Sequence, residues 1–190
     1  MPVDCQKLLI LDTQFGFFSL IFQASTVLHL SLGHVSRADI RRAFQDRRLA
    51  QFRAPLCEVS DPPNAAIFRL VDQLTRYTAG HREAFARVRI DSRGLTPFTL
   101  RVIAACQKIP YGQTVTYGEL ARSSGSPRGA RSVGTVMAQN RFPLLVPCHR
   151  VVAAGGRLGG FSAAGGQGLK QQLLEMEAAA SGKRLALAAE

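Results

Sequence analysis

One cysteine of the sequence has neighbours that suit covalent chemistry. Cys148 is followed directly by His149 and Arg150, in the run Leu144-Leu-Val-Pro-Cys-His-Arg-Val-Val152. A nearby imidazole and guanidinium favour the thiolate, which is the form of cysteine that acts as a nucleophile. Nothing around Cys148 resembles a cysteine-protease signature. We therefore interpret Cys148 as a candidate nucleophile, with a purely structural Cys-His pair as the alternative.

The other three cysteines have different surroundings. Cys5, Cys57 and Cys106 are widely and irregularly spaced, with no CxxC pair. Cys106 falls in an apolar helical segment, where burial raises the pKa of a thiol and makes it inert. A chain of this length with four cysteines is not a disulfide scaffold, so we expect reduced thiols.

Charge and hydropathy narrow the class of protein. The chain has 190 residues, of which 46% are hydrophobic, and its 24 basic against 13 acidic side chains give a net charge of +11. It is long enough for one or two compact domains, and its longest mainly apolar stretch, residues 15–22, is too short to cross a membrane. Asp4 argues against a signal peptide, so we expect a soluble intracellular protein without membrane contact. The basic balance favours a polyanionic partner such as nucleic acid.

The first half of the chain combines strands and helices. Apolar alternation and turns predict an antiparallel meander followed by two helices. The strands are expected at residues 7–11, 17–22 and 27–32, and the helices at 36–50 and 65–78. Ser36 would cap the first helix, Gly80 would end the second, and residues 88–90 would form a last strand. We predict an α/β N-terminal domain, a small antiparallel sheet plus helices, over residues 1–92.

The second half is mainly helical. Its helices are expected at residues 97–107, 116–123, 127–140 and 167–180. Pro97 and Pro127 would open the first and third of these, because proline suits the first turn of a helix. The second and third helices have the length and punctuation of a helix-turn-helix. We predict a mainly α C-terminal domain with a helix-turn-helix over residues 93–190.

The third of these helices has an unusual face. Small and apolar residues recur on it at offsets of three and four, namely Ala130, Val133, Gly134, Met137 and Ala138. Such a face could approach the wall of a DNA groove closely, with Arg128 and Arg131 beside it. The alternative is that small residues merely allow tight packing on the preceding helix.

The motifs of the second half resemble, in order and spacing, those of the O6-alkylguanine-DNA alkyltransferases, the methylated-DNA–protein-cysteine methyltransferase family. The matching motifs are Ile109-Pro-Tyr-Gly112, Tyr117-Gly-Glu-Leu-Ala121, Ala130-Arg-Ser-Val-Gly134, Met137, Asn140, Pro143 and Leu145-Val-Pro-Cys-His-Arg-Val-Val152. The resemblance covers about residues 96–178. Residues 1–92 resemble the family's N-terminal domain only in length and in the Asp12-Thr-Gln-Phe-Gly16 turn.

The resemblance implies that Cys148 accepts the alkyl group of O6-alkylguanine directly and is thereby spent. His149 would activate the thiol through a water molecule, and Glu177, which its helix places among apolar residues, would orient His149. Tyr117 would donate to guanine N3 as the leaving anion forms. Asn140 would be a hydrogen-bonded hinge between the DNA-reading helix and the active site.

The resemblance also implies contacts to DNA and to the flipped base. Arg131 would enter the duplex and fill the stack that the flipped nucleotide vacates. The other DNA-binding candidates are Ala130, Gly134, Met137, Thr99 and Arg150. The candidates for binding the alkylated base are Val151, Ser162, Phe161 and Pro143. Phe161 stands where the family usually has tyrosine.

The implied partner is double-stranded DNA that contains O6-alkylguanine, bound by a monomer that could act cooperatively on DNA, without a diffusible cofactor. Cys5 and His29 resemble half of a structural zinc site of some relatives, but no convincing second pair appears, so we predict no metal. The protein would be cytoplasmic and nucleoid-associated in a prokaryote, and nuclear in a eukaryote.

Two other functions compete with alkyl transfer. One is a lesion-sensing alkyltransferase-like protein that binds alkylguanine without transferring anything, but such relatives lack the cysteine that Cys148 supplies. The other is a helix-turn-helix transcription regulator, whose recognition helix would carry more base-reading polar side chains than residues 127–140 do.

Overall fold

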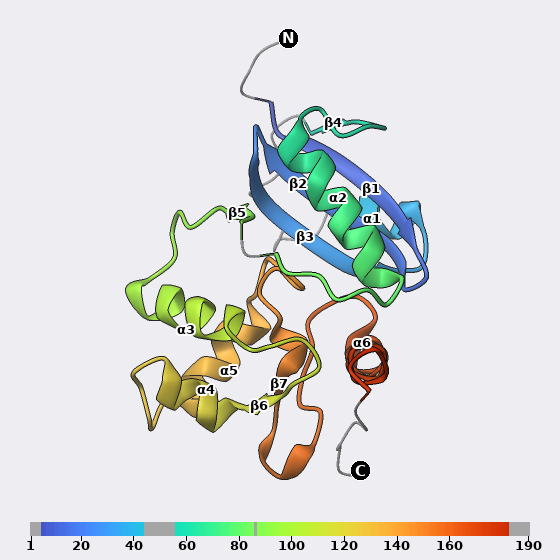
Figure 1. Cartoon of the computed structure of the whole chain (residues 1–190). Coiled ribbons are helices and arrows are strands. Elements are labelled where there is room, and N and C mark those ends of the chain that lie inside the picture. The colour runs from blue at the N-terminus through green and yellow to red at the C-terminus, as the bar shows by residue number, and fades with distance from the viewer. Residues whose placement is uncertain (1–4, 44–55, 86, 183–190) are drawn as a thin grey trace.

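The computed structural model describes residues 5–43, 56–85 and 87–182. Its N-terminal part is built on a sheet of five strands in the order β4-β1-β2-β3-β5, and its C-terminal part is mainly helical (Figure 1). The strands are β1 (Lys7–Thr13), β2 (Gly16–Gln23), β3 (Thr26–His34), β4 (Cys57–Glu58) and β5 (Arg89–Ile90). A sheet accompanied by helices is the arrangement that the sequence predicted.

The three long strands form the expected antiparallel meander. Leu9 pairs with Leu20 and Leu20 with Leu30, so these side chains share one face, while Leu8 and Ile21 lie on the other. All five are buried, which means that both faces of the sheet are covered. The edge strands β4 and β5 pair in parallel with β1 and β3 and are two residues long. The sequence predicted β5 but not β4, because two exposed residues carry no apolar alternation.

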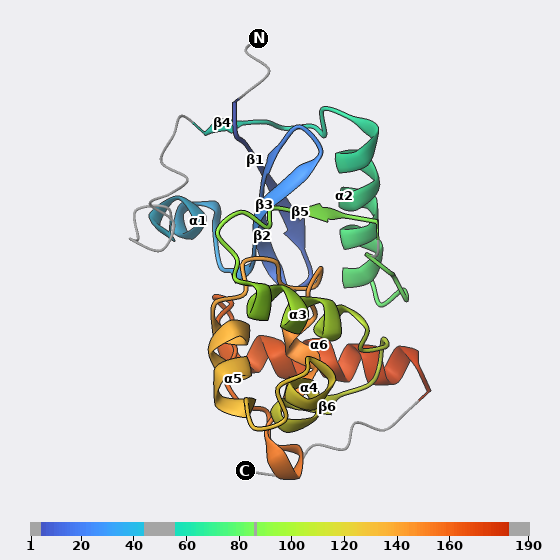
Figure 2. The same ribbon diagram turned by 90° about the vertical axis from the view of Figure 1, so that its left-hand side faces the viewer.

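One helix packs on each face of the sheet (Figure 2). Helix α1 (Arg37–Ala43) buries Ile40 in the smaller apolar cluster, and the predicted continuation of this helix to residue 50 lies outside the described residues. Helix α2 (Ala65–Thr78) begins where the Asn64 side chain accepts two backbone N–H bonds. It ends before Gly80, whose φ of 90° suits glycine.

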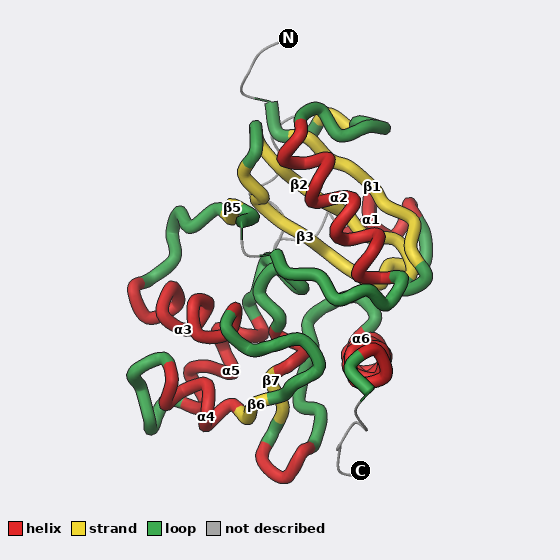
Figure 3. Tube along the Cα trace, viewed as in Figure 1, coloured by secondary structure: helices red, strands yellow, loops and turns green. Residues whose placement is uncertain are grey.

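The C-terminal part consists of four helices with short strands and turns between them. Its elements are α3 (Pro97–Gln107), β6 (Val115–Thr116), α4 (Tyr117–Ser123), α5 (Ala130–Ala138), the 3₁₀ turns η2 (Cys148–Arg150) and η3 (Ala154–Gly156), β7 (Val151–Val152) and α6 (Gly166–Ala180). Most of the chain between α5 and α6 is loop (Figure 3). The expected caps are present, because Thr96 and Thr116 each accept a backbone N–H at the start of α3 and α4.

The boundaries predicted for α5 were wrong at both ends. Pro127 does not open the helix, since the N–H of Gly129 bonds the carbonyl of Ser126 and closes a separate turn first. The helix then begins at Ala130 and stops at Ala138, so Asn140 lies beyond it. Helix α5 packs against α4 across this turn.

The two parts of the chain are joined by backbone hydrogen bonds. The N–H of Leu30 in β3 bonds the carbonyl of Arg141 at 2.9 Å, and the N–H of Ala164 bonds the carbonyl of Leu32 at 3.2 Å. The larger apolar core also runs through both parts, from Leu20 of the sheet to Leu173 of α6. Within the described residues, no helix has the length and apolar character needed to cross a bilayer.

Candidate active site

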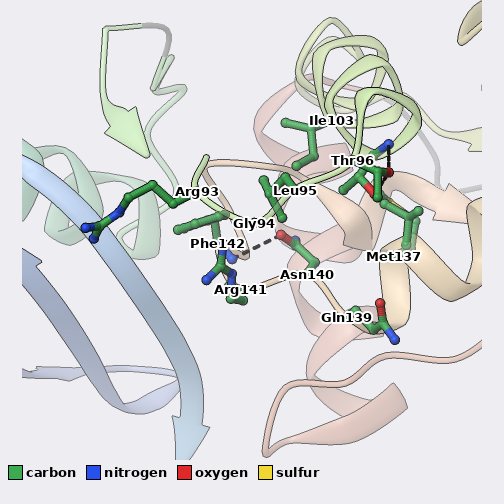
Figure 4. Close-up of a pocket in the computed structure, with 12 residues that line it drawn as sticks. Arg93, Gly94, Leu95, Thr96, Ile103, Met137, Gln139, Asn140, Arg141 and Phe142 are labelled. Carbon is green, nitrogen blue, oxygen red and sulfur yellow. Dashed lines mark hydrogen bonds between the residues drawn. The ribbon is translucent and has the colours of Figure 1, made fainter. Parts of the chain in front are cut away.

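The cysteine motif is held by Asn140. Its Nδ2 donates to the carbonyl of Val146 at 2.9 Å and lies 3.1 Å from the Sγ of Cys148, while its Oδ1 accepts from the N–H of Phe142 at 3.0 Å. Figure 4 shows the last of these bonds, with the amide of Asn140 turned toward Phe142. Leu144, in the same loop, adopts a left-handed φ of 68°, which costs a side-chain-bearing residue energy. One amide therefore fixes a strained loop and touches the thiol that follows it.

The Cys148 thiol is buried, with 5% of its surface exposed. Burial raises its pKa above the usual value, whereas the hydrogen bond from Asn140 and the charge of Lys170 oppose this rise. The sequence suggested that the neighbouring guanidinium of Arg150 would favour the thiolate. This expectation was wrong, because Arg150 directs its charge to Glu177 instead.

Arg150 is also misplaced for the DNA contact expected of it. Its side chain is 7% exposed, with Nη2 2.8 Å from Glu177 Oε1 and Nη1 2.8 Å from the carbonyl of Ile109. Its guanidinium lies about 5.6 Å from the centre of the Tyr111 ring. A carboxylate, a carbonyl and an aromatic ring thus hold Arg150 inside the protein.

Glu177 is the centre of the buried polar network. Its carboxylate is fully buried and accepts hydrogen bonds from four residues of three separate segments, namely Tyr77 Oη (2.6 Å), Gly112 N (2.9 Å), His149 Nε2 (3.0 Å) and Arg150 Nε and Nη2 (3.0 and 2.8 Å). Burial by itself would raise the pKa of Glu177, but the hydrogen bonds from His149 and Arg150 and the charge of Arg150 outweigh it and hold that pKa well below its usual range. The carboxylate is therefore ionised at neutral pH.

His149 is fully buried next to this anion. Burial lowers its pKa, and the attraction of Glu177 only partly offsets the effect, so the imidazole is neutral at pH 7. An ionised carboxylate can only accept hydrogen bonds, which assigns the imidazole proton to Nε2. Nδ1 then carries a lone pair, and it has no hydrogen-bond partner among the described residues.

Two residues of the site were missed in the sequence. Tyr77, at the end of α2, donates to Glu177 and lies 3.2 Å from His149 Nε2. Its position continues the spacing of buried Ile67, Leu70 and Leu74, which marked it as inward-facing but gave no hint of a polar partner one hundred residues away.

The second missed residue is Lys170 of α6, which is fully buried. Its Nζ donates to the carbonyl of Val151 at 2.6 Å and lies 3.4 Å from that of Gly160. Burial lowers its pKa to about 8, although the nearby Cys148 sulfur raises it. A signal was available, because Lys170 shares the apolar stripe of α6 with Leu173 and Leu174.

The remaining base-binding candidates differ in their exposure. Tyr117 is half-buried, and burial together with the charge of a Cys148 thiolate raises its pKa. Its ring packs on Gly159, where any side chain would approach the phenol to about 3.2 Å. Phe161 is half-buried and Ser162 exposed, while Pro143 and Val151 are buried.

The DNA-binding candidates on α5 divide between surface and core. Arg131 is exposed, and Ala130 and Gly134 are partly exposed beside it. Met137 is only 4% exposed and packs with Val133 in the apolar core, so its side chain does not line a groove as expected. The packing interpretation is confirmed for Val133 and Met137, which face the core. The approach of Ala130 and Gly134 to a DNA groove stays a prediction.

Thr99 lies at the start of α3. It is half-buried, with its backbone N–H and hydroxyl both bonded to the Thr96 side chain. Nearby is a cavity of about 390 Å³, shown in Figure 4, whose lining includes Arg93, Thr96, Ile103, Met137, Asn140 and Phe142. Cys148 does not line this cavity. The candidate active site is therefore identified by the hydrogen-bond network around Glu177 and not by the cavity.

Comparison with known proteins places the chain in a family. Residues 97–179 match the family described as 6-O-methylguanine DNA methyltransferase, DNA binding domain. A methylated-DNA–protein-cysteine methyltransferase of Mycobacterium tuberculosis is 43% identical over 131 residues, which cover 69% of this chain and 77% of the relative. This chain belongs to the methylated-DNA–protein-cysteine methyltransferase family, and with it to the methyltransferases.

Two further relatives extend the comparison. The crystal structure of Mycobacterium tuberculosis OGT in complex with DNA superposes with a TM-score of 0.72 at 32% identity, over 92% of this chain and 94% of that one. A DNA base-flipping protein of Thermus thermophilus is 44% identical over 116 residues, which cover 60% of this chain and 76% of the relative. The likeness to OGT thus includes the N-terminal part, which the family match leaves out.

Glu177→Gln should lower the free energy of unfolding by about 3 kcal/mol at pH 7, because it leaves the buried Arg150 without its counter-charge. The pKa of this carboxyl is lower in the folded protein than in the unfolded chain. Its ionised form therefore stabilises the fold above the unfolded pKa, about 4.5, and that contribution is lost as the pH falls below this value. Urea denaturation at pH 7 and at pH 3.5 should show the loss caused by the substitution shrinking in acid.

The matched control is Glu175→Gln in the same helix. Glu175 is exposed and bonds only Gln171 in the described structure. Its substitution should change the free energy of unfolding by less than about 0.5 kcal/mol. Equal losses in the two variants would mean that Glu177 contributes no more than a surface charge.

Proposed function

We propose that this methyltransferase repairs DNA by moving the alkyl group of O6-alkylguanine to the Sγ of Cys148 in a single turnover. The observation that carries this proposal is the Cys148 thiol, held by Asn140 beside a neutral His149 that Glu177 orients. The DNA complex of the Mycobacterium tuberculosis relative and the names of the curated relatives support DNA as the substrate.

The proposed activation uses the two nitrogens of His149 differently. Nε2–H donates to Glu177, so Nδ1 is the basic atom that takes the proton of Cys148 through a bridging water molecule. Because its pKa is so low, Glu177 stays ionised and orients the imidazole rather than accepting the proton itself. The positive charge that forms on His149 is then stabilised by a carboxylate 3.0 Å away.

In the transfer step, the thiolate attacks the alkyl carbon. The new S–C bond forms as the bond from that carbon to O6 breaks, and the electron pair of the broken bond stays on the guanine. Tyr117 stabilises this anion by donating to N3, and Lys170 favours the thiolate through its charge. No step removes the alkyl group from sulfur, so each protein molecule acts once.

The base must leave the duplex to reach a buried thiol. We assign α4 and α5 as a helix-turn-helix that enters the minor groove, with Ala130 and Gly134 close to the groove wall and Arg131 in the vacated stack. The net charge of +11 supports binding to the phosphates. The outward position of these three residues is compatible with this role, whereas Met137 and Arg150 are too deeply buried for it.

Other groups complete the proposed base site. The carbonyls of Val151 and Cys148 would accept from the exocyclic amine, and the N–H of Ser162 would donate to O6. Lys170 already bonds the Val151 carbonyl, but a carbonyl has a second lone pair for the base. Phe161 and Pro143 would shape the wall around the alkyl group, and Thr99 would contact a phosphate.

The likeness to a DNA base-flipping protein favours a second candidate, a lesion-binding protein that flips the base without transferring the alkyl group. One experiment separates the two. The protein is incubated with a duplex containing a single O6-methylguanine, and its intact mass and its tryptic peptides are measured. Transfer predicts the addition of one methyl group to the peptide of residues 142–150, which carries Cys148.

Cys148→Ser should abolish this addition while DNA affinity stays within about twofold, because the thiol makes no phosphate contact. Cys106→Ala is the matched control, since Cys106 is also buried and burial raises its pKa. The control should still be methylated in full. Methylation of the Cys148→Ser variant, or of a different peptide in the parent protein, would contradict the assignment.

Tyr77→Phe should slow transfer about tenfold without changing DNA affinity, because the phenyl ring remains but the bonds to Glu177 and His149 are lost. Tyr111→Phe is the control, since among the described residues this hydroxyl bonds neither group and makes one long bond, of 3.4 Å, to the carbonyl of Gly80. Single-turnover rates with a free O6-alkylguanine base measure the chemistry alone. Equal rates for the two variants would remove Tyr77 from the positioning of His149.

Arg131→Ala should reduce the transfer rate on duplex DNA by about tenfold or more, while the reaction with the free base is unchanged, because a free base needs no flipping. Arg128→Ala is the control, as it removes an equal charge from an exposed neighbouring position. In that variant, DNA affinity and the rate of repair should fall only by the amount expected from the loss of one phosphate contact. Equal effects of the two substitutions on duplex repair would assign Arg131 a general electrostatic role.

A further inference from the structure

Two cysteines outside the active site lie side by side at the edge of the sheet. Cys5 lies two residues before the start of β1 and Cys57 opens β4, and their sulfurs are 2.7 Å apart. The backbone fixes this approach, because Cys57 pairs with Lys7 in the parallel ladder and its N–H bonds the carbonyl of Gln6 at 3.1 Å. A disulfide bond is about 2.05 Å long, so the sulfurs need to move by less than about 1 Å to form one.

Accessibility separates this pair from the other cysteines. Cys57 is exposed and Cys5 is half-exposed, whereas Cys106 and Cys148 are buried. Reaction with a soluble oxidant requires an accessible thiolate. The pair therefore holds the cysteine thiols that such an oxidant meets first in the described structure.

The pair fits a disulfide better than a metal ion. Within the described residues, no group of three or more His, Cys, Asp or Glu side chains is placed to hold a metal. Two sulfurs would fill only half of the tetrahedral shell that zinc prefers, whereas a disulfide needs only the two.

We propose that Cys5 and Cys57 are a redox modification site, which a hydroperoxide converts to an intramolecular disulfide while Cys148 stays reduced. The Cys57 thiolate attacks the O–O bond of the peroxide, forming a sulfenic acid as the other oxygen leaves and takes up a proton. Cys5 then attacks that sulfur, so the S–S bond forms, the S–O bond breaks and water leaves. Two thiols and one hydrogen peroxide give one disulfide and two water molecules.

The disulfide would tie β4 to the start of β1 and close a loop between residues 52 positions apart. This link restrains the unfolded chain more than the folded one, in which the two strands are already paired. It would also protect the exposed thiols from irreversible oxidation to sulfinic acid. The nucleophile, in the other part of the chain, would be left unchanged.

Peptide mapping tests this directly, because trypsin places the four cysteines on four different peptides, residues 1–7, 54–69, 102–108 and 142–150. The reduced full chain is treated with one equivalent of hydrogen peroxide at pH 8, and the remaining thiols are alkylated. The protein is then digested with trypsin and the masses of the peptides are measured. The peptides of residues 1–7 and 54–69 should appear linked, with a mass two hydrogen atoms below their sum. Dithiothreitol should separate them.

The variants make the result specific. Cys57→Ser and Cys5→Ser should each abolish the link, and Cys106→Ala should leave it unchanged. In the parent protein, the peptides of residues 1–7 and 54–69 should lose their thiols about tenfold faster than residues 142–150. The proposal is overturned if the thiol of residues 142–150 reacts first, or if the link joins two protein molecules. Because no DNA is present, neither outcome depends on alkyl transfer.

Discussion

The buried negative charge of Glu177 is the constraint on which the rest of this site depends. A carboxylate without water must be surrounded by donors, and a single element cannot supply them. The structure meets this need with side chains from α2 and the cysteine motif and a backbone N–H from the loop before β6, all converging on α6. The packing of four distant segments is thus fixed by the solvation of one ion.

The same arrangement explains why neighbours in sequence and neighbours in space differ around the nucleophile. Arg150 follows Cys148 by two positions, yet its charge is used to balance Glu177. The cation that acts on the sulfur is Lys170, which comes from another helix and also holds the carbonyl of Val151. In the resting protein, burial keeps the thiol protonated, so reactivity depends on the imidazole beside it and not on a permanently charged sulfur.

The elements of the fold that depend on local patterns were predicted from the sequence. The meander followed from apolar alternation, and the starts of α3 and α4 followed from Thr96 and Thr116, because a cap is decided within four residues. The end of α5 and the burial of the Met137 side chain in the core were not predictable in this way, because tertiary packing determines them.

The same distinction between local patterns and tertiary packing applies to the residues of the candidate site. The Cys148 motif is contiguous and was recognised with the face of α6 that carries Glu177, whereas Tyr77 bonds a residue one hundred positions away. Lys170 could have been noticed as a charge in an apolar stripe, but its two partners are backbone carbonyls, of Val151 in β7 and of Gly160 in a loop, that no periodicity specifies.

The hydroxyl of Tyr77 has a consequence for how the two parts of the chain can evolve. In the described structure, the hydrogen bonds of the Cys148, His149 and Glu177 side chains go to no residue of the five-stranded sheet or of α1, so selection on the chemistry leaves most of their sequence free to drift. The final turn of α2 is different, because a replacement there must still bring a donor to a carboxylate buried in the other half. A chimaera that joined this C-terminal half to an unrelated N-terminal half would inherit every residue of the cysteine motif and still lack one donor of the network that orients it.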